Sequence, residues 1–71
     1  MTPREEELLT GMGNCFAACG ANFEETVEMV AGSRGLTTAS VKETLRSLRE
    51  RFGDDPGFQR LRRRLPAEFP F

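Results

Sequence analysis

Apolar residues recur at intervals of three and four positions along most of this chain, and that spacing predicts amphipathic α-helices. The first stretch predicts a helix from about Pro3 to Ala18, with Thr2 as its N-cap and Gly20 as its C-terminal stop. Gly11 and Gly13 lie inside it, so they either permit close packing of another helix or bend this one. Its apolar stripe consists of Leu8, Leu9, Met12, Cys15, Phe16 and Cys19.

The second stretch predicts a helix that Asn22 caps, with Glu25 as capping-box partner, and that ends at Gly32. Its apolar face leaves out Met29 and consists of Phe23, Val27, Val30 and Ala31. The next residues, up to Gly35, are expected to form a turn. Leu36 is expected to anchor that turn in the core.

Thr37 or Thr38 is expected to cap a third helix, which Gly53 ends. The core-facing side of this helix spans a narrow arc and consists of Val41, Leu45, Leu48 and Phe52. An acidic residue followed by proline, Asp55 and Pro56, predicts the start of a fourth, short helix. Its apolar positions are Phe58, Leu61 and Leu65.

Pro66 stops the fourth helix, and Pro70 keeps the remaining residues out of regular structure. Phe69 and Phe71 would each forgo roughly 1.5–3 kcal/mol of burial in water, so we expect the tail to fold back over the helices or to bind a partner. No stretch alternates apolar and polar residues as a strand does. The sequence therefore predicts an all-α fold: one helical domain over residues 1–71, with three to four helices and the Pro/Phe tail packed on the core.

The composition indicates where in the cell the protein is expected. Apolar residues make up 38% of the chain and charged residues 30%, with a net charge of −1, which is typical of a globular domain rather than a disordered segment. No apolar run approaches the roughly 20 residues that span a bilayer, and the N-terminus lacks a signal-peptide pattern. We therefore expect a cytoplasmic protein without a membrane partner.

Charge is unevenly divided between the two halves of the chain. Residues 1–33 carry one base and six acids, whereas residues 34–71 carry nine bases and five acids. The basic half suggests a surface that could meet phosphate, although a solvated helix face explains it equally well. The near-neutral total counts against a dedicated nucleic-acid domain, because such domains are usually basic throughout.

Candidate catalytic chemistry is sparse. The chain has no histidine, the commonest general base and zinc ligand, and its two cysteines cannot close a zinc site alone. Cys15 and Cys19 share the apolar stripe and are expected to be buried, reduced and small. The clustered glutamates at 5–7 and at 24 and 28 are interpreted as helix-start charges. We expect no enzyme, no metal, no cofactor and no small-molecule substrate.

One spacing carries a functional hypothesis. Ala31 is small enough for a close helix crossing, Gly35 follows four positions later, and a glycine there allows a turn with positive φ. Leu36 comes next, and Val41 and Leu45 then lock the third helix down. Over about 20 residues the segment resembles the helix-turn-helix unit of bacterial transcription regulators. The resemblance implies a small DNA-binding module that acts as a transcription regulator, and a dimer for specific affinity.

Two positions depart from the pattern of such units: Arg34 replaces an apolar residue, and Thr44 is less apolar than usual. The resemblance implies that the helix from Thr38 to Arg46 enters the major groove by its N-terminal end. It assigns base edges to Thr38, Ala39 and Lys42, with Arg46 further along the helix, and it places Arg34, Thr37 and Arg49 near phosphates. No β-hairpin is predicted after Phe52, so a winged variant is not expected.

Acidic residues on the same outer face oppose this hypothesis. Glu43 and Glu50 would approach phosphates, unless Glu43 accepts a hydrogen bond from a cytosine amino group. A second basic cluster consists of Arg60, Arg62, Arg63 and Arg64. These arginines either contact phosphates or form a solvated face that pairs with the glutamates of the first half.

The alternative function is a non-enzymatic protein-interaction module or small adaptor, binding a protein partner or a second copy of the chain. It rests on the near-neutral charge, on the glutamates of the third helix and on the apolar end at Phe69 and Phe71.

Overall fold

A computed structural model describes residues 1–20 and 22–71, and within them the chain forms four α-helices and no strand. Their bounds are α1 (Pro3–Cys19), α2 (Phe23–Arg34), α3 (Thr38–Phe52) and α4 (Pro56–Arg62). Each helix starts at a side chain that accepts a hydrogen bond from a free backbone N–H of the first turn. These N-caps are Thr2, Asn22, Thr37 and Asp55, as the sequence predicted.

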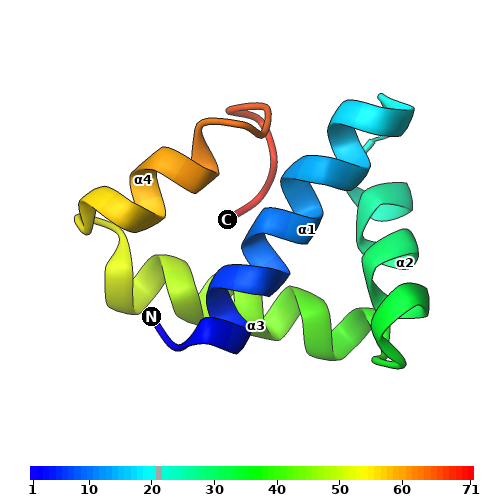
Figure 1. The fold of residues 1–71 in the computed structure, drawn as a ribbon, viewed down its shortest axis with the longest axis horizontal. Helices are drawn as coiled ribbons and strands as arrows, with labels where there is room; N and C mark the ends of the chain where they lie inside the picture. The colour runs from blue at the N-terminus through cyan, green and yellow to red at the C-terminus, as the bar shows by residue number, and fades with distance from the viewer. Residues whose placement is uncertain (21) are drawn as a thin grey trace.

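Helices α1 and α3 form the centre of the fold, and each of them also contacts α2 and α4. Figure 1 shows α1 crossing in front of α3, with α2 and α4 at opposite ends and the C-terminal tail running between α4 and α1. The buried apolar residues come from all four helices and the tail, and they match the predicted stripes. They are Leu8, Leu9, Met12, Val27, Val30, Ala31, Val41, Leu45, Leu48, Phe58, Leu65 and Phe69. The predicted all-α class with the tail on the core is confirmed.

The predicted end of α2 at Gly32 is wrong, because the helix continues to Arg34. A glycine inside a helix costs only about 1 kcal/mol, and Ser33 adds a hydroxyl bond to the carbonyl of Val30 at 3.0 Å. The residue that ends the helix is Gly35, which takes the left-handed conformation at φ 65°.

Two further predictions are corrected by the packing. Leu36 does not anchor the turn in the core but is 44% exposed, because α2 ends later and carries the turn to the surface. Cys19 is exposed and Cys15 only partly buried, since α1 projects beyond α2 at its last turn. Both cysteines are free thiols.

Gly11 and Gly13 are covered by arginine side chains. A Cβ atom on Gly11 would lie 3.0 Å from Arg34 Nη2, and one on Gly13 would lie 3.4 Å from the side chain of Arg64. The two glycines therefore let guanidinium groups lie flat on α1, rather than bending the helix or admitting another one.

The tail is fastened to the helices at both its apolar and its polar atoms. The ring of Phe69 is 6% exposed and meets the rings of Phe16 and Phe23 edge-on, at 5.5 Å and 5.3 Å. Arg62 donates hydrogen bonds to four backbone carbonyls, those of Leu65, Pro66, Phe69 and Phe71, at 3.0–3.2 Å. The tail thus joins α4 to the last turn of α1 and to the first turn of α2, and α4 makes no direct contact with α2.

Candidate nucleic-acid interface

The turn between α2 and α3 is three residues long and is held by the last turn of α2. The N–H groups of Gly35 and Leu36 both donate to the carbonyl of Ala31. Ala31 is 3% exposed, and Val41 of α3 is fully buried. Ala31 and Val41 are thus buried on either side of the left-handed Gly35, and α3 crosses α2 steeply (Figure 1).

The predicted DNA-binding residues of α3 lie on its outer side. Thr38, Ala39, Arg46 and Arg49 are exposed, and Lys42 is partly buried. The hydroxyl of Thr37 is already used, because it accepts a hydrogen bond from the N–H of Ser40. Of the predicted residues, α3 therefore presents short side chains at its leading end and two arginines in its second half.

Carboxylates lie within reach of two of these bases. Lys42 Nζ is 2.7 Å from a carboxylate oxygen of Glu24 on α2, and Arg46 Nη2 is 3.5 Å from one of Glu43. With Glu50 also exposed on α3, the outer face carries three bases and three acids. Glu24 is a member of this face that the sequence did not reveal, because it is 18 residues from Lys42 and only the packing of α2 on α3 joins them.

A shallow pocket of about 330 Å³ lies on this face. It brings together Ala39, Lys42 and Arg46 with Phe23 from α2 and Pro70 from the tail. Three predicted residues are thus neighbours, but the first turn of α2 and the end of the tail border them. Pro70 was another member that no local pattern could reveal.

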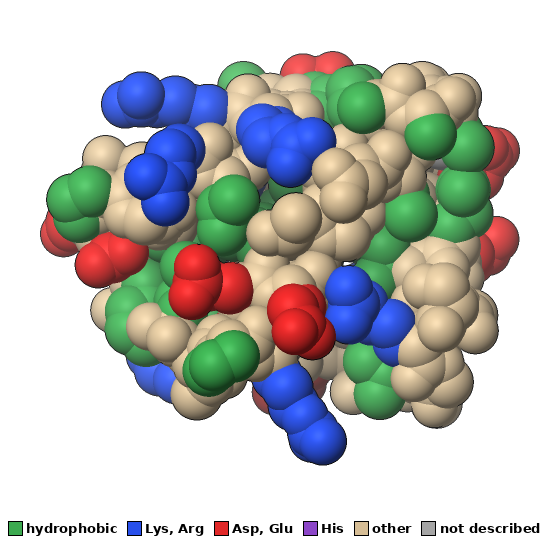
Figure 2. Space-filling model, viewed as in Figure 1, with side chains coloured by type: hydrophobic (Ala, Val, Ile, Leu, Met, Phe, Trp, Pro, Cys, Tyr) green, Lys and Arg blue, Asp and Glu red, His purple; other side chains and the backbone are tan. Residues whose placement is uncertain are grey.

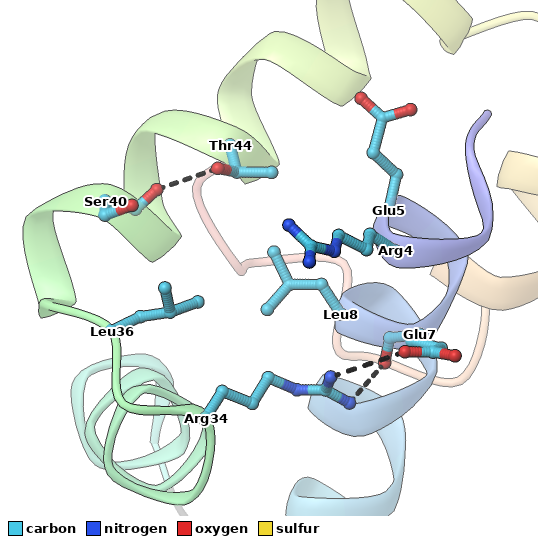
Figure 3. Close-up of a pocket in the computed structure, with 8 residues that line it drawn as sticks. All are labelled: Arg4, Glu5, Glu7, Leu8, Arg34, Leu36, Ser40 and Thr44. Atoms are coloured by element: carbon cyan, nitrogen blue, oxygen red, sulfur yellow. Dashed lines mark hydrogen bonds and ion pairs between the residues drawn. The ribbon is translucent and has the colours of Figure 1, made fainter.

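Arg34 lies apart from this group. Its Nη2 donates to the carbonyl of Glu7 at 2.9 Å, and its Nη1 lies 3.9 Å from the carboxylate of the same residue. The guanidinium is therefore turned onto α1 (Figure 3). It lines a different pocket from the one that Lys42 and Arg46 line.

The arginines of α4 do not pair with the glutamates of the first half, at least among the residues that the structure describes. Arg62 binds the tail carbonyls and Arg64 binds the side chain of Asn14 at 2.8 Å, while Arg60 and Arg63 are exposed. Figure 2 shows basic side chains gathered over α4, away from the acidic edge of α2. Three of these acids pair with other bases instead: Glu5 and Glu24 with bases of α3, and Glu7 with Arg34 of α2.

Glu5 is the most strongly bonded of the acids in the first half. Its carboxylate accepts a hydrogen bond from the N–H of Thr2 and pairs with Arg51, and these two interactions hold the pKa of Glu5 below its ordinary value. Because the pKa is lower in the folded chain than in the unfolded chain, the stabilisation is present above the ordinary pKa and is lost as the pH falls through the folded one.

We therefore expect the free energy of unfolding to decline as the pH is lowered below the ordinary glutamate pKa of 4.5. Glu5→Gln should make that decline shallower, as measured by urea unfolding over a pH series. The exposed neighbour Glu6 supplies the control, because Glu6→Gln should leave the slope unchanged. Identical pH profiles for the wild type and Glu5→Gln would contradict this role.

Other kinds of site have no support in the described parts of the chain. No group of three or more potential metal-ligating side chains comes together in residues 1–20 and 22–71. In the same residues, no helix combines the length and the apolar character needed to cross a bilayer.

Comparison with known proteins finds no protein that this chain is similar to. The chain matches no protein-family model, no curated protein and no solved structure. The geometry of the α2–α3 pair and its charges therefore provide the basis for a function.

Proposed function

We propose that this protein is a small DNA-binding module in which α3 enters the major groove of duplex DNA by its N-terminal half. The observation that carries the proposal is the α2–α3 pair itself. A three-residue turn with Gly35 in the left-handed region joins α2 to α3, with Ala31 buried before the turn and with Thr38 and Ala39 exposed at the leading end of α3. Short side chains at that end allow close approach to base edges.

In this proposal the charged residues of the face exchange partners on binding. Surface ion pairs are worth about 0–1 kcal/mol, so Lys42 and Arg46 can leave Glu24 and Glu43 for phosphate or base acceptors at small cost. Three acids among three bases reduce the gain from counterion release. A single copy therefore binds weakly, and specific affinity requires two copies on two half-sites.

The proposal assigns the module to transcription regulation in a bacterial cytoplasm. The resemblance of the α2–α3 segment to regulator units supports the regulatory role. Two free thiols, Cys15 and Cys19, are typical of a reducing compartment.

Two charge variants of α3 test whether DNA binds at this face or responds only to the overall charge of the protein. Arg46→Gln should weaken binding to mixed-sequence duplex DNA and reduce the dependence of log K on log salt by about one. Glu43→Gln should strengthen binding, because it removes a carboxylate that repels phosphate and competes for Arg46. Binding is measured by fluorescence anisotropy at low and at physiological salt.

Matched controls make the same change in charge at a different place on the surface. Arg60→Gln on α4 and Glu6→Gln on α1 should change binding less than their counterparts on α3, since both are exposed away from the pocket at Ala39. Equal effects of Arg46→Gln and Arg60→Gln would show a diffuse charge effect and no defined interface. No binding at low salt, where non-specific association is strongest, would sink the proposal.

A protein-interaction module is the second candidate, and one observation favours it. The face of α3 is electrically balanced, and its pocket includes apolar groups of Phe23, Ala39 and Pro70. Protein interfaces combine apolar contacts with matched charges in this way, whereas DNA interfaces are strongly basic. Absence of DNA binding with intact folding would leave this candidate in front.

A further inference from the structure

A groove lies on the other flank of α3, between the first turns of α1 and the turn before α3. It has a volume of about 440 Å³ and is shown in Figure 3. Leu8 forms its base, and Leu36 reaches over it from the turn. Ser40 and Thr44 line the α3 side. The volume is within the range of roughly 300–1,000 Å³ of sites that hold a bound group.

The exposure of Leu36 gives the groove an apolar character. This leucine is 44% exposed, and it is one of only two large hydrophobic residues exposed in the described parts of the chain. Leu8, at the base, is 5% exposed and continues into the core. A side chain entering the groove would therefore remove apolar surface of Leu36 from water, which is favourable.

Basic groups border the groove. Arg4 extends over the pocket toward Thr44, and Arg34 borders the opposite edge (Figure 3). The two acids on the rim already have partners, since Glu5 binds Arg51 and Glu7 binds Arg34. Arg4 forms no ion pair within residues 1–20 and 22–71. The unused charge at the rim is therefore positive.

The second exposed hydrophobic residue lies on the outer face of α2. Met29 is 40% exposed, and Glu25 lies one turn before it at i, i+4. Glu28 directly precedes Met29 in the sequence and lies one turn after Glu25. Neither glutamate forms an ion pair with any described residue. One turn further along, Gly32 faces open space, so a partner surface can come close to the helix there. This face therefore carries an exposed apolar side chain with unpaired negative charge next to it.

We propose that a second copy of the chain docks here: Met29 of one copy inserts into the Leu8–Leu36 groove of the next, with Glu25 and Glu28 facing Arg4. The chain itself supplies the matching chemistry, because each exposed hydrophobic residue is bordered by the charge that the other lacks. Methionine suits the role, since its flexible side chain adapts to an open groove. The inference does not depend on DNA binding.

The two surfaces are different parts of the molecule, so the contact is heterologous. Such contacts close into a pair only if both are made at once, and otherwise they continue from copy to copy. The contact area is small, and we expect weak association with a Kd on the order of 0.1–1 mM. Association should weaken at high salt, because the charge pairs lie at an exposed rim.

Complementation between two variants tests the contact. Met29→Asp removes the inserted side chain but keeps the groove, and Leu36→Asp spoils the groove but keeps Met29. Each variant alone should remain monomeric in analytical ultracentrifugation between about 0.02 and 1 mM, the range that brackets the expected Kd. An equimolar mixture should form one-to-one pairs and nothing larger, because only one functional combination of surfaces remains.

Circular dichroism should give unchanged folding for both variants, since both positions are exposed. Ala67→Asp, an exposed site on the tail, controls for the added negative charge and should associate as the wild type does. A wild-type chain that stays monomeric over this range would overturn the proposal. Association that survives in either variant alone, or a mixture that fails to pair, would overturn it as well. All readouts are masses without DNA, so this failure is separate from failure of the DNA proposal.

Discussion

Phe69→Ala is expected to lower the free energy of unfolding by about 3–5 kcal/mol, the range for removing a buried aromatic side chain. The ring is 6% exposed and packs edge-on against both Phe16 and Phe23, so its loss leaves a cavity that three segments line. A domain of 71 residues has a total stability of only about 4–10 kcal/mol. The variant should therefore be partly unfolded at physiological temperature.

Chemical and thermal unfolding followed by circular dichroism measure this effect, and Phe71→Ala is the matched control. Phe71 is only partly buried and contacts the Phe23 ring at 6.2 Å, so its replacement should cost clearly less. If Phe69→Ala were as stable as the wild type, the tail would contribute nothing to the stability of the fold and would be free to bind a partner. The expected result makes the tail part of the core.

Arg62→Met is expected to cost about 2–3 kcal/mol, because the guanidinium donates to four tail carbonyls and methionine donates to none. Burial is the main cause that lowers the pKa of Arg62, followed by the nearby charge of Arg49, while Glu68 acts in the opposite direction. The group remains charged at neutral pH because arginine titrates far above it. The hydrogen bonds must therefore outweigh a desolvation cost.

The neighbouring Arg63 gives a direct control for this prediction. Arg63 is exposed, so Arg63→Met should change the free energy of unfolding by less than about 0.5 kcal/mol. Arg62→Lys should recover little, since one ammonium group cannot reach carbonyls that a planar fork spans. Equal stabilities of Arg62→Met and Arg63→Met would show that the carbonyl contacts contribute nothing.

These two predictions bear on the proposed interface as well as on stability. Pro70 shares a pocket with Ala39, Lys42 and Arg46, so the tail borders the face of α3 that we propose for DNA. Loss of the Phe69 or Arg62 contacts should detach the tail and remove Pro70 from this pocket. Binding measurements on either variant must therefore be interpreted together with its stability.

Most of the fold was predictable because its signals are local. Caps such as Thr2 and Asn22 bond to N–H groups three residues away, and apolar spacing reports which side of a helix is buried. The error at the end of α2 arose where two local signals compete. Gly32 and Gly35 both mark a helix end in sequence, and only the observed left-handed backbone of Gly35 decides between them.

The candidate site was predictable only in part. The exposed positions on α3 followed from its periodicity, since Val41 and Leu45 point inward and Ala39 and Arg46 must then point out. The charge of the site could not be predicted from periodicity, because Glu24, which pairs with Lys42, is 18 residues away in the chain. Periodicity assigns a residue to a face, but it does not say which other element borders that face.

The sequence by itself determined the all-α class with three to four helices, where the helices begin, most of the buried positions, and that the terminal phenylalanines need burial. The tertiary structure alone decided which charges pair, that Leu36 stays on the surface, and that Arg62 fastens the tail rather than meeting phosphate. The physical reason is distance along the chain. Caps and stripes depend on residues within one turn, whereas Arg51 meets Glu5 across 46 residues and only helix packing brings them together.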